Sequence, residues 1–353
     1  MRIDKYIVGV DMIPVITPNI TFSGSIIGKA QKMVINLQKR IYKHFIQGNF
    51  KKAKQLQRLL YKSYSNTIAS IYKVTCVNKG KKTAGIDGVV AKNDQSRNII
   101  LREILGMTQK NQPYKPKPVR RLYIPKKDGT KRPLGIPIIM DRVMQAIVEN
   151  ILYPYTESQV ASYEAHSYGF RKGVSTFDAI SSIVARLFRA KSPRLILDGD
   201  FRKCFDNISH ESIIEKASLG MSKSHLKITK GWLEAGHIEI DGQLYLENKG
   251  TPQGGIISPT LCNLVLNELH KDIKPWRNQN GTLKPNQISI HRYADDFICI
   301  MPFDKYLEVT TKQILKTVKP IGLELHPDKT KTIKGEPFQF LGYEICQKDK
   351  WIA

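Results

Sequence analysis

Acidic residues are missing from a long stretch near the start of this 353-residue chain. No Asp or Glu occurs between Met12 and Ile86, whereas Lys and Arg recur throughout. Residues 1–140 hold 28 Lys+Arg and 6 Asp+Glu, which is +22 of the total formal net charge of +25. A basic half joined to a near-neutral half indicates a module that binds a polyanion. The alternative is a basic face that only contacts solvent.

Cysteines are few and long apolar runs are missing. The five cysteines form no C-x-x-C pair and no Cys/His cluster, so neither a disulfide framework nor a zinc site is predicted. Free thiols suit a reducing compartment. No apolar run reaches the roughly 18 residues of a membrane span, and the first residues lack the pattern of a secretory signal. We therefore expect an intracellular protein that is not secreted and binds no membrane.

Two amphipathic helices are expected in the acid-free stretch. Apolar residues recur every three or four positions over residues 26–47 and again over residues 50–72, and Gly48 with Asn49 separates the two runs. The second helix carries basic residues on the side away from its apolar stripe. These are the candidate phosphate-contacting side chains: Lys51, Lys52, Lys54, Arg58 and Lys62.

The remaining pattern predicts an α+β fold. A turn at Asp128-Gly129 within residues 121–137 indicates a β-hairpin. Apolar runs at residues 194–200 and 288–301 are typical of strands, and residues 141–152 and 261–270 of helices. These elements do not follow the strand–helix–strand rhythm of a parallel sheet.

Acidic residues gather at two strand ends in the second half of the chain. Asp200 follows an apolar strand, and Asp295 and Asp296 lie between apolar residues at an expected hairpin turn. Adjacent carboxylates repel each other and favour a nearby cation. Oxygen ligands suit Mg²⁺, and two such ions about 4 Å apart support in-line phosphoryl transfer. The alternative is an ordinary solvated turn, and spacing alone does not decide between them.

The segments around these acids resemble the sequence motifs of reverse transcriptases, in that family's order. The central ones are DGDFRKCFDNISH, GTPQGG and YADD, at residues 198–210, 250–255 and 293–296. Similar segments also occur at residues 120–137, 167–175, 322–331 and 338–345. Residues 27–89 look like the N-terminal extension of group II intron-encoded proteins. The resemblance covers roughly residues 26–346.

This resemblance implies a right-hand polymerase with fingers and palm, an antiparallel palm sheet and a helical N-terminal extension. The expected domains are a basic RNA-binding extension at residues 1–85, fingers at 86–195, a palm at 196–346 and the start of a thumb at 347–353. Relatives of the group II type continue into a thumb or maturase domain and often an endonuclease. We expect this chain to lack those domains, and it has Val174 where such relatives usually carry Arg.

The resemblance also implies the catalytic residues. Asp200, Asp295 and Asp296 match the carboxylates that hold two Mg²⁺ ions, with Mn²⁺ as a substitute, and the carbonyl of Phe201 matches a further metal ligand. Phe205 matches the steric gate, whose ring crowds a ribose 2′-hydroxyl and selects deoxynucleotides. The alternative for Phe205 is an ordinary core residue.

Further residues match positions that contact the substrate. Lys126 and Arg132 correspond to basic residues that grip the incoming triphosphate, and Gln253 to a residue beside the nascent base pair. Lys329 is a candidate proton donor to the leaving pyrophosphate, and Arg171 a candidate RNA contact. The alternatives are surface charges for the three basic substrate contacts and a plain loop residue for Gln253.

The function that the resemblance implies is RNA-directed DNA synthesis of the group II intron type. The expected partners are group II intron RNA, an RNA template with a DNA primer, and dNTPs, with a role in intron splicing and mobility. The alternatives are a non-catalytic RNA-binding maturase and another bacterial reverse transcriptase lineage, of the retron or antiphage kind. RNA-directed RNA synthesis is disfavoured by Phe205. The high Lys, Ile and Asn content suits an AT-rich genome, and hence a bacterial cytoplasm or an organelle.

Overall fold

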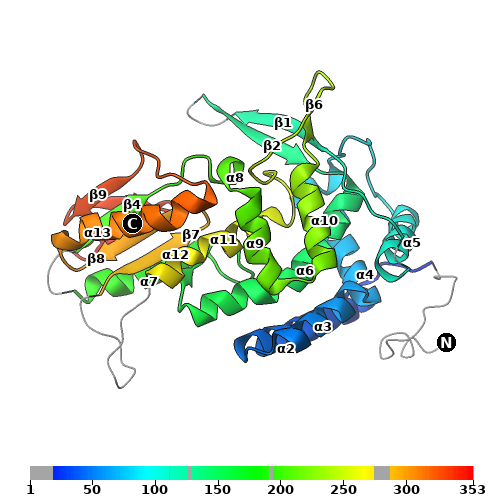
Figure 1. Ribbon diagram of the computed structural model, residues 1–353, viewed down its shortest axis with the longest axis horizontal. Coiled ribbons are helices and arrows are strands. Elements are labelled where there is room, and N and C mark those ends of the chain that lie inside the picture. Colours follow the sequence, from blue (N-terminus) through cyan, green and yellow to red (C-terminus); the bar gives the residue numbers. More distant parts are fainter. Residues whose placement is uncertain (1–18, 111, 126–128, 191–193, 274–286, 353) are drawn as a thin grey trace. The chain divides into compact units, whose positions relative to one another are not determined.

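The chain forms two compact units, each built from two separate stretches of sequence. The computed structural model describes residues 19–110, 112–125, 129–190, 194–273 and 287–352 (Figure 1). The first unit contains Met1–Glu157 and Ile214–Ser258, and the second contains Ser158–Ile213 and Pro259–Ala353. The expected fingers segment, residues 86–195, is therefore shared between the two units. The division into extension, fingers and palm stays a prediction.

Residues 24–72 of the acid-free stretch form three α-helices, where the sequence pattern predicts two. Helix α2 (Gly24–Ile46) confirms the first expected helix. The single helix expected over residues 50–72 is wrong, because α3 (Phe50–Tyr61) and α4 (Tyr64–Tyr72) are separate. Ser63 has extended backbone angles, and its hydroxyl accepts a hydrogen bond from the Asn66 N–H at 3.4 Å. Ser63 therefore ends the run and caps a new helix. Helix α2 contacts both α3 and α4 (Figure 1).

Apolar stripes and buried amides build the core of the first unit. The stripe of α2 faces inward, as its spacing predicts, and Ile41 is fully buried. Gln57 on α3 is also fully buried. Its Nε2 donates to the carbonyls of Ile151 on α6 (Ile139–Ser162) and Gly220 on α9 (His210–Gly220), at 2.7 Å each. These bonds fix α3 against two segments distant in sequence, because a buried amide needs partners.

The first unit also contains the expected hairpin. Strands β1 (Val119–Pro125) and β2 (Lys131–Ile136) pair in antiparallel register. They belong to a four-stranded sheet of order β2-β1-β5-β6, in which β5 is His237–Ile238 and β6 is Leu244–Tyr245. The unit also contains α5 (Asp94–Gln109) and α10 (Lys223–Glu234).

A five-stranded sheet organises the second unit. Its order is β3-β7-β8-β4-β9, and β8 pairs antiparallel with both β4 and β7. The strands are β3 (His166–Ser167), β4 (Leu195–Gly199), β7 (Ser289–Tyr293), β8 (Asp296–Met301) and β9 (Lys331–Lys334). The apolar run at residues 288–301 is thus a hairpin, which confirms the expected turn at Asp295 and Asp296.

Apolar side chains cover one face of this sheet. Ile196, Ile298 and Ile300 pack with Ile183 of α7 (Thr176–Phe188) and with Phe338 in a buried cluster. Phe338 belongs to a second, three-stranded sheet. The second unit also contains the α-helices α8 (Cys204–Asn207), α11 (Ser258–Leu266), α12 (Glu268–Asp272) and α13 (Leu307–Val318), and the strands β10 (Phe338–Phe340), β11 (Tyr343–Cys346) and β12 (Trp351–Ile352). In the described parts of the chain, no helix is long and apolar enough to cross a membrane.

A buried carboxyl holds the chain segment that leads into β1. Asp141 is 1% exposed, accepts a hydrogen bond from the Tyr114 hydroxyl, and accepts another from the Lys117 N–H at 3.0 Å. The indole N–H of Trp232 donates to the Tyr114 oxygen at 2.6 Å. Burial raises the pKa of Asp141 to about 6, although both hydrogen bonds act in the opposite direction.

This raised pKa predicts a pH-dependent stability. The folded chain holds the Asp141 proton more tightly than the unfolded chain, so this group's contribution is full below about pH 4 and is lost as pH rises through about 6. The loss amounts to roughly 3 kcal/mol for a shift of about two pH units. The free energy of unfolding is measured in urea between pH 4 and 7. In Asp141→Asn, its decline with rising pH is expected to be flatter than in the native chain. An unchanged slope would contradict this assignment.

Candidate active site

The register of the second unit's sheet brings the three predicted catalytic acids to one end of it. Strand β4 pairs with β8 up to Gly199 and Phe297, so Asp200, the next residue, comes opposite Asp296. Strand β7 ends at Tyr293, which pairs with Asp296. Asp295 therefore lies in a two-residue turn with Ala294, whose φ of +60° is left-handed.

Electrostatics confirm that these acids influence one another. Desolvation and the negative charges of Asp295, Asp200 and Asp198 raise the pKa of Asp296 to about 7. Desolvation is the larger cause of the raised pKa of Asp296, and repulsion by the three neighbouring carboxylates adds to it. Lys329 offsets part of this charge, because its Nζ lies 2.7 Å from Oδ2 of Asp200. That hydrogen bond raises the pKa of Lys329.

The site offers hard oxygen ligands but no assembled metal cage. Among the described residues, no three His, Cys, Asp or Glu side chains group closely enough to hold a metal ion. The crowding that raises the pKa of Asp296 is what a divalent cation would relieve, and carboxylate oxygens suit Mg²⁺. The chemistry of these donors, though not their present spacing, therefore suits such an ion.

Arg292 fixes the turn that carries the acids, and sequence reasoning missed it. This arginine is 0% exposed. Its Nη1 donates to the Ala294 carbonyl at 2.7 Å, directly before Asp295. Its remaining acceptors are Asn263 Oδ1 at 2.9 Å, Ser167 Oγ at 2.7 Å and Asn267 Oδ1 at 2.8 Å. An arginine in the strand that leads directly into the acidic turn was the available signal, because a buried guanidinium needs several partners.

A glycine-containing segment packs directly against the same turn. A Cβ atom on Gly169 would lie 2.2 Å from the Ala294 nitrogen, so only glycine fits there. The Tyr168 N–H donates to the Arg292 carbonyl at 2.9 Å. Arg171, the predicted RNA contact, donates through Nη1 to the Ser167 carbonyl. Arg171 thus has a structural partner within the second unit.

The two predicted phenylalanines lie beside the acids in sequence and are both buried. Phe201 is 2% exposed, and its ring stacks on Phe297 with centroids 5.2 Å apart. Phe205, the predicted steric gate, is 7% exposed, and its ring meets Phe170 edge-on at 5.8 Å. Phe170 itself is 42% exposed and has a left-handed φ of +61°. The left-handed backbone at Phe170 therefore sets the position of the Phe170 ring.

The first unit brings together two of the predicted substrate contacts. The Arg132 Nε donates to Gln253 Oε1 at 2.6 Å. Gly254 has a φ of +121°, and a Cβ on it would approach the Gly135 oxygen to 2.4 Å. The PQGG loop therefore lies against the β1–β2 hairpin. Lys126 lies outside the described residues.

The basic side of α3 is mostly exposed, as predicted. Lys51, Lys52 and Arg58 are exposed. Lys54 is half-buried, and its Nζ donates to the Ser218 carbonyl at 3.1 Å. Lys54 therefore contributes to the fold of the first unit, whereas the other three face solvent.

Comparison with known families identifies the chain. Residues 124–345 match the family model described as reverse transcriptase (RNA-dependent DNA polymerase), and residues 27–104 match the N-terminal domain of reverse transcriptase. The chain belongs to the reverse transcriptase family.

Its relatives include group II intron-encoded proteins. It is 32% identical over 326 residues to protein YkfC of Escherichia coli K12, covering 83% of this chain and 84% of YkfC. It is 30% identical over 326 residues to the group II intron-encoded protein LtrA of Lactococcus lactis, covering 76% of this chain and 53% of LtrA. The chain thus spans about half the length of LtrA. A putative COX1/OXI3 intron 1 protein of Saccharomyces cerevisiae is 35% identical over 279 residues, covering 66% of this chain and 33% of that protein.

Solved structures confirm the fold class. Telomerase from Candida tropicalis in complex with a fragment of telomeric RNA aligns with a TM-score of 0.54 at 15% identity, covering 82% of this chain and 52% of that chain. Telomerase from Candida albicans aligns with a TM-score of 0.52 at 17% identity, covering 69% and 46%. The α+β fold is therefore that of a right-hand polymerase.

The buried guanidinium predicts a large stability effect. Arg292→Lys keeps the charge, but a single ammonium cannot reach all four acceptors, and those left unpaired are buried. We expect the free energy of unfolding in urea to fall by about 3 kcal/mol. The control is Arg186→Lys, because Arg186 is half-buried and donates to the Gln287 carbonyl. Equal losses in both variants would show that Arg292 has no special role.

Proposed function

We propose that this chain is an RNA-directed DNA polymerase of the group II intron type. It would extend a DNA primer on an RNA template with dNTPs, in a bacterial cytoplasm or an organelle, where intron RNA is made. The observation that carries the proposal is the register that gathers Asp200, Asp295 and Asp296 at one sheet end. Family membership supports the same chemistry.

Divalent cations would bind at this sheet end. Asp200, Asp295 and Asp296, with the carbonyl of Phe201, are the proposed ligands of two Mg²⁺ ions, for which Mn²⁺ is a substitute. When bound, the ions supply Lewis acidity that activates the primer 3′-hydroxyl and stabilises the leaving pyrophosphate. Before they bind, Lys329 neutralises part of the acidic charge through Asp200.

The other proposed roles belong to residues around the reacting groups. The Lys329 side chain is 60% exposed, so its ammonium can leave Asp200 and donate a proton to the pyrophosphate. The Phe205 ring would exclude a ribose 2′-hydroxyl, which favours DNA synthesis over RNA synthesis. Arg132 would bind the triphosphate together with Lys126, and Gln253, which now accepts from Arg132, would contact the nascent base pair.

Removing both turn acids tests the proposal. The variant Asp295→Ala/Asp296→Ala should lose primer extension on poly(rA)/oligo(dT), by a factor of about 10³ or more, because oxygen ligands for the ions are gone. Extension is measured as dTTP incorporation in the presence of Mg²⁺. Normal incorporation by the double variant would overturn the assignment.

A matched control removes two acids elsewhere in the second unit. Asp304 and Glu308 are exposed and pair with Lys334 and Lys312. The variant Asp304→Ala/Glu308→Ala carries the same change of net charge. It should keep normal extension, which separates loss of the site from loss of negative charge.

A second candidate function is splicing assistance through RNA binding alone. The exposed basic side of α3 favours it, since Lys51, Lys52 and Arg58 face solvent in a stretch without acids. The group II intron-encoded relatives support intron RNA as the partner. The two functions are compatible in one chain, and intact turn acids favour retained polymerase activity.

Charge removal on α3 tests RNA docking. Lys51→Ala/Lys52→Ala/Arg58→Ala should weaken binding to group II intron RNA and reduce the slope of log affinity against log salt by about 2 to 3. Lys54 stays unchanged in this variant because it contacts Ser218. The control is Lys312→Ala/Lys316→Ala/Lys319→Ala on and beside α13, where all three are exposed. If only the control lowers the slope, the docking surface lies elsewhere.

A further inference from the structure

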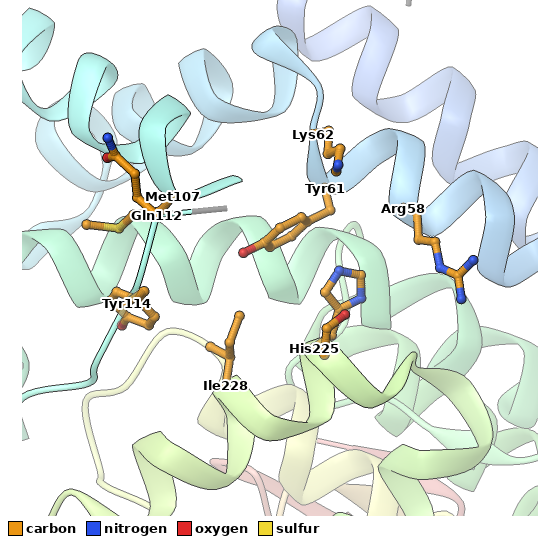
Figure 2. Close-up of a pocket in the computed structure, with 9 residues that line it drawn as sticks. Arg58, Tyr61, Lys62, Met107, Gln112, Tyr114, His225 and Ile228 are labelled. Atoms are coloured by element: carbon orange, nitrogen blue, oxygen red, sulfur yellow. The ribbon is translucent and has the colours of Figure 1, made fainter. Parts of the chain in front are cut away.

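The first unit contains a cavity that the proposed polymerase chemistry does not use. Its volume is about 370 Å³, near the lower end of the range of about 300–1,000 Å³ for small-molecule sites. Figure 2 shows that its lining comes from α3, from the end of α5 with the segment that follows, and from α10. All of these segments belong to the first unit.

A largely buried imidazole lines the cavity. His225 on α10 is 2% exposed. Its Nδ1 has no hydrogen-bond partner among the described residues. Burial lowers the pKa of His225 to about 4, so the ring is neutral at physiological pH and one of its nitrogens accepts a hydrogen bond. This Nδ1 is sealed from solvent, so a ligand in the cavity would reach the ring through its other nitrogen, Nε2, which can donate or accept a hydrogen bond in a neutral imidazole.

Aromatic rings give the cavity flat walls. The ring of Tyr61 lies 4.5 Å from that of His225, and Figure 2 shows the two rings next to each other. The Tyr114 hydroxyl is engaged by Asp141 and Trp232, so Tyr114 offers the cavity mainly its ring. Unpaired nucleic-acid bases are held in this way, by stacking on aromatic and histidine rings and by hydrogen bonds to their edges.

The charges around the cavity suit a phosphate backbone. Arg58 and Lys62 line it, both are exposed, and neither forms an ion pair with any described residue. No acidic residue lines the cavity. Lys51 and Lys52 continue the positive charge along α3, and a rise of 1.5 Å per residue places Lys52 about 15 Å from Lys62. A track of that length fits several linked nucleotides better than a free one.

We propose that this cavity binds one unpaired base of an RNA strand, with His225 contacting the base edge and Arg58 and Lys62 contacting the adjoining phosphates. The inference rests on the proposed function only for its premise that the chain binds RNA. It adds the class of ligand, a flipped or single-stranded base, and the residues that hold it.

The test compares two strands that share a charged backbone. Binding of the full chain to fluorescein-labelled oligouridine is measured beside binding to an abasic strand of equal length. The His225→Phe variant keeps a ring but removes both nitrogens, so it should weaken oligouridine binding about tenfold and leave the abasic strand unaffected. Its thermal unfolding temperature should hold or rise, because a buried unpaired polar atom is removed.

Two matched variants separate base binding from other effects. His44 on α2 also has a buried Nδ1 without a partner among the described residues, but it lies outside the cavity. His44→Phe should leave both affinities unchanged. Lys51→Ala removes a charge outside the cavity, so it should weaken the binding of oligouridine and of the abasic strand equally.

Three results would overturn the inference: equal binding of both strands by the native chain, unchanged oligouridine binding by His225→Phe, or uridine monophosphate binding as tightly as the strand. The last result would assign the cavity to a free nucleotide. The Asp295→Ala/Asp296→Ala variant should keep the preference for bases after losing primer extension. A failure of the base-binding proposal can therefore be distinguished from a failure of the polymerase assignment.

Discussion

The buried guanidinium of Arg292 is the interaction on which the acidic end of the second unit depends. It bonds to the carbonyl of Ala294, a residue with left-handed backbone angles, and so holds the turn in an otherwise unfavourable conformation. Burial lowers the pKa of Arg292 to about 10, which still leaves it charged at neutral pH. The negative charge of Asp295 acts on this guanidinium and favours its charged form. Arg292 thus both fixes the shape of the turn and interacts with the negative charge that the turn carries.

Much of the fold follows from patterns that are local in sequence. The apolar stripe of α2 has a spacing that only a helix can bury on one side, and the expected hairpins at residues 121–137 and 288–301 are present. The expectation of one helix over residues 50–72 was wrong because the apolar spacing continues across Ser63. The backbone is extended at Ser63, whose side chain caps the start of α4. A serine within a periodic run is ambiguous, since the same side chain can face solvent in a helix or begin the next one.

The site was predictable only in part. Motif order predicted Asp200, Asp295 and Asp296 as one site, and the sheet register explains how residues almost a hundred positions apart meet. The partners of Arg292 were not predictable, because Ser167 and the pair Asn263 and Asn267 come from two segments distant from Arg292 in sequence, which only the folded second unit brings together. The same is true of the bond between Arg132 and Gln253, which depends on the first unit taking in residues 214–258. Periodicity carries no information on such pairings.

The uneven charge of the sequence acquires a physical meaning from the two units. The first contains the acid-free stretch, and its exposed basic residues attract a polyanion over a distance of about a Debye length. The acidic end of the second unit would repel the same polyanion. Lys329 pairs with Asp200 and lowers the pKa of Asp296 in part, but burial and the neighbouring negative charges still raise that pKa. In the proposed polymerase, a phosphate would approach this end only when further positive charge is present, so cation binding and substrate binding would be coupled. The carboxylates that would hold the ions thereby also make substrate entry depend on them.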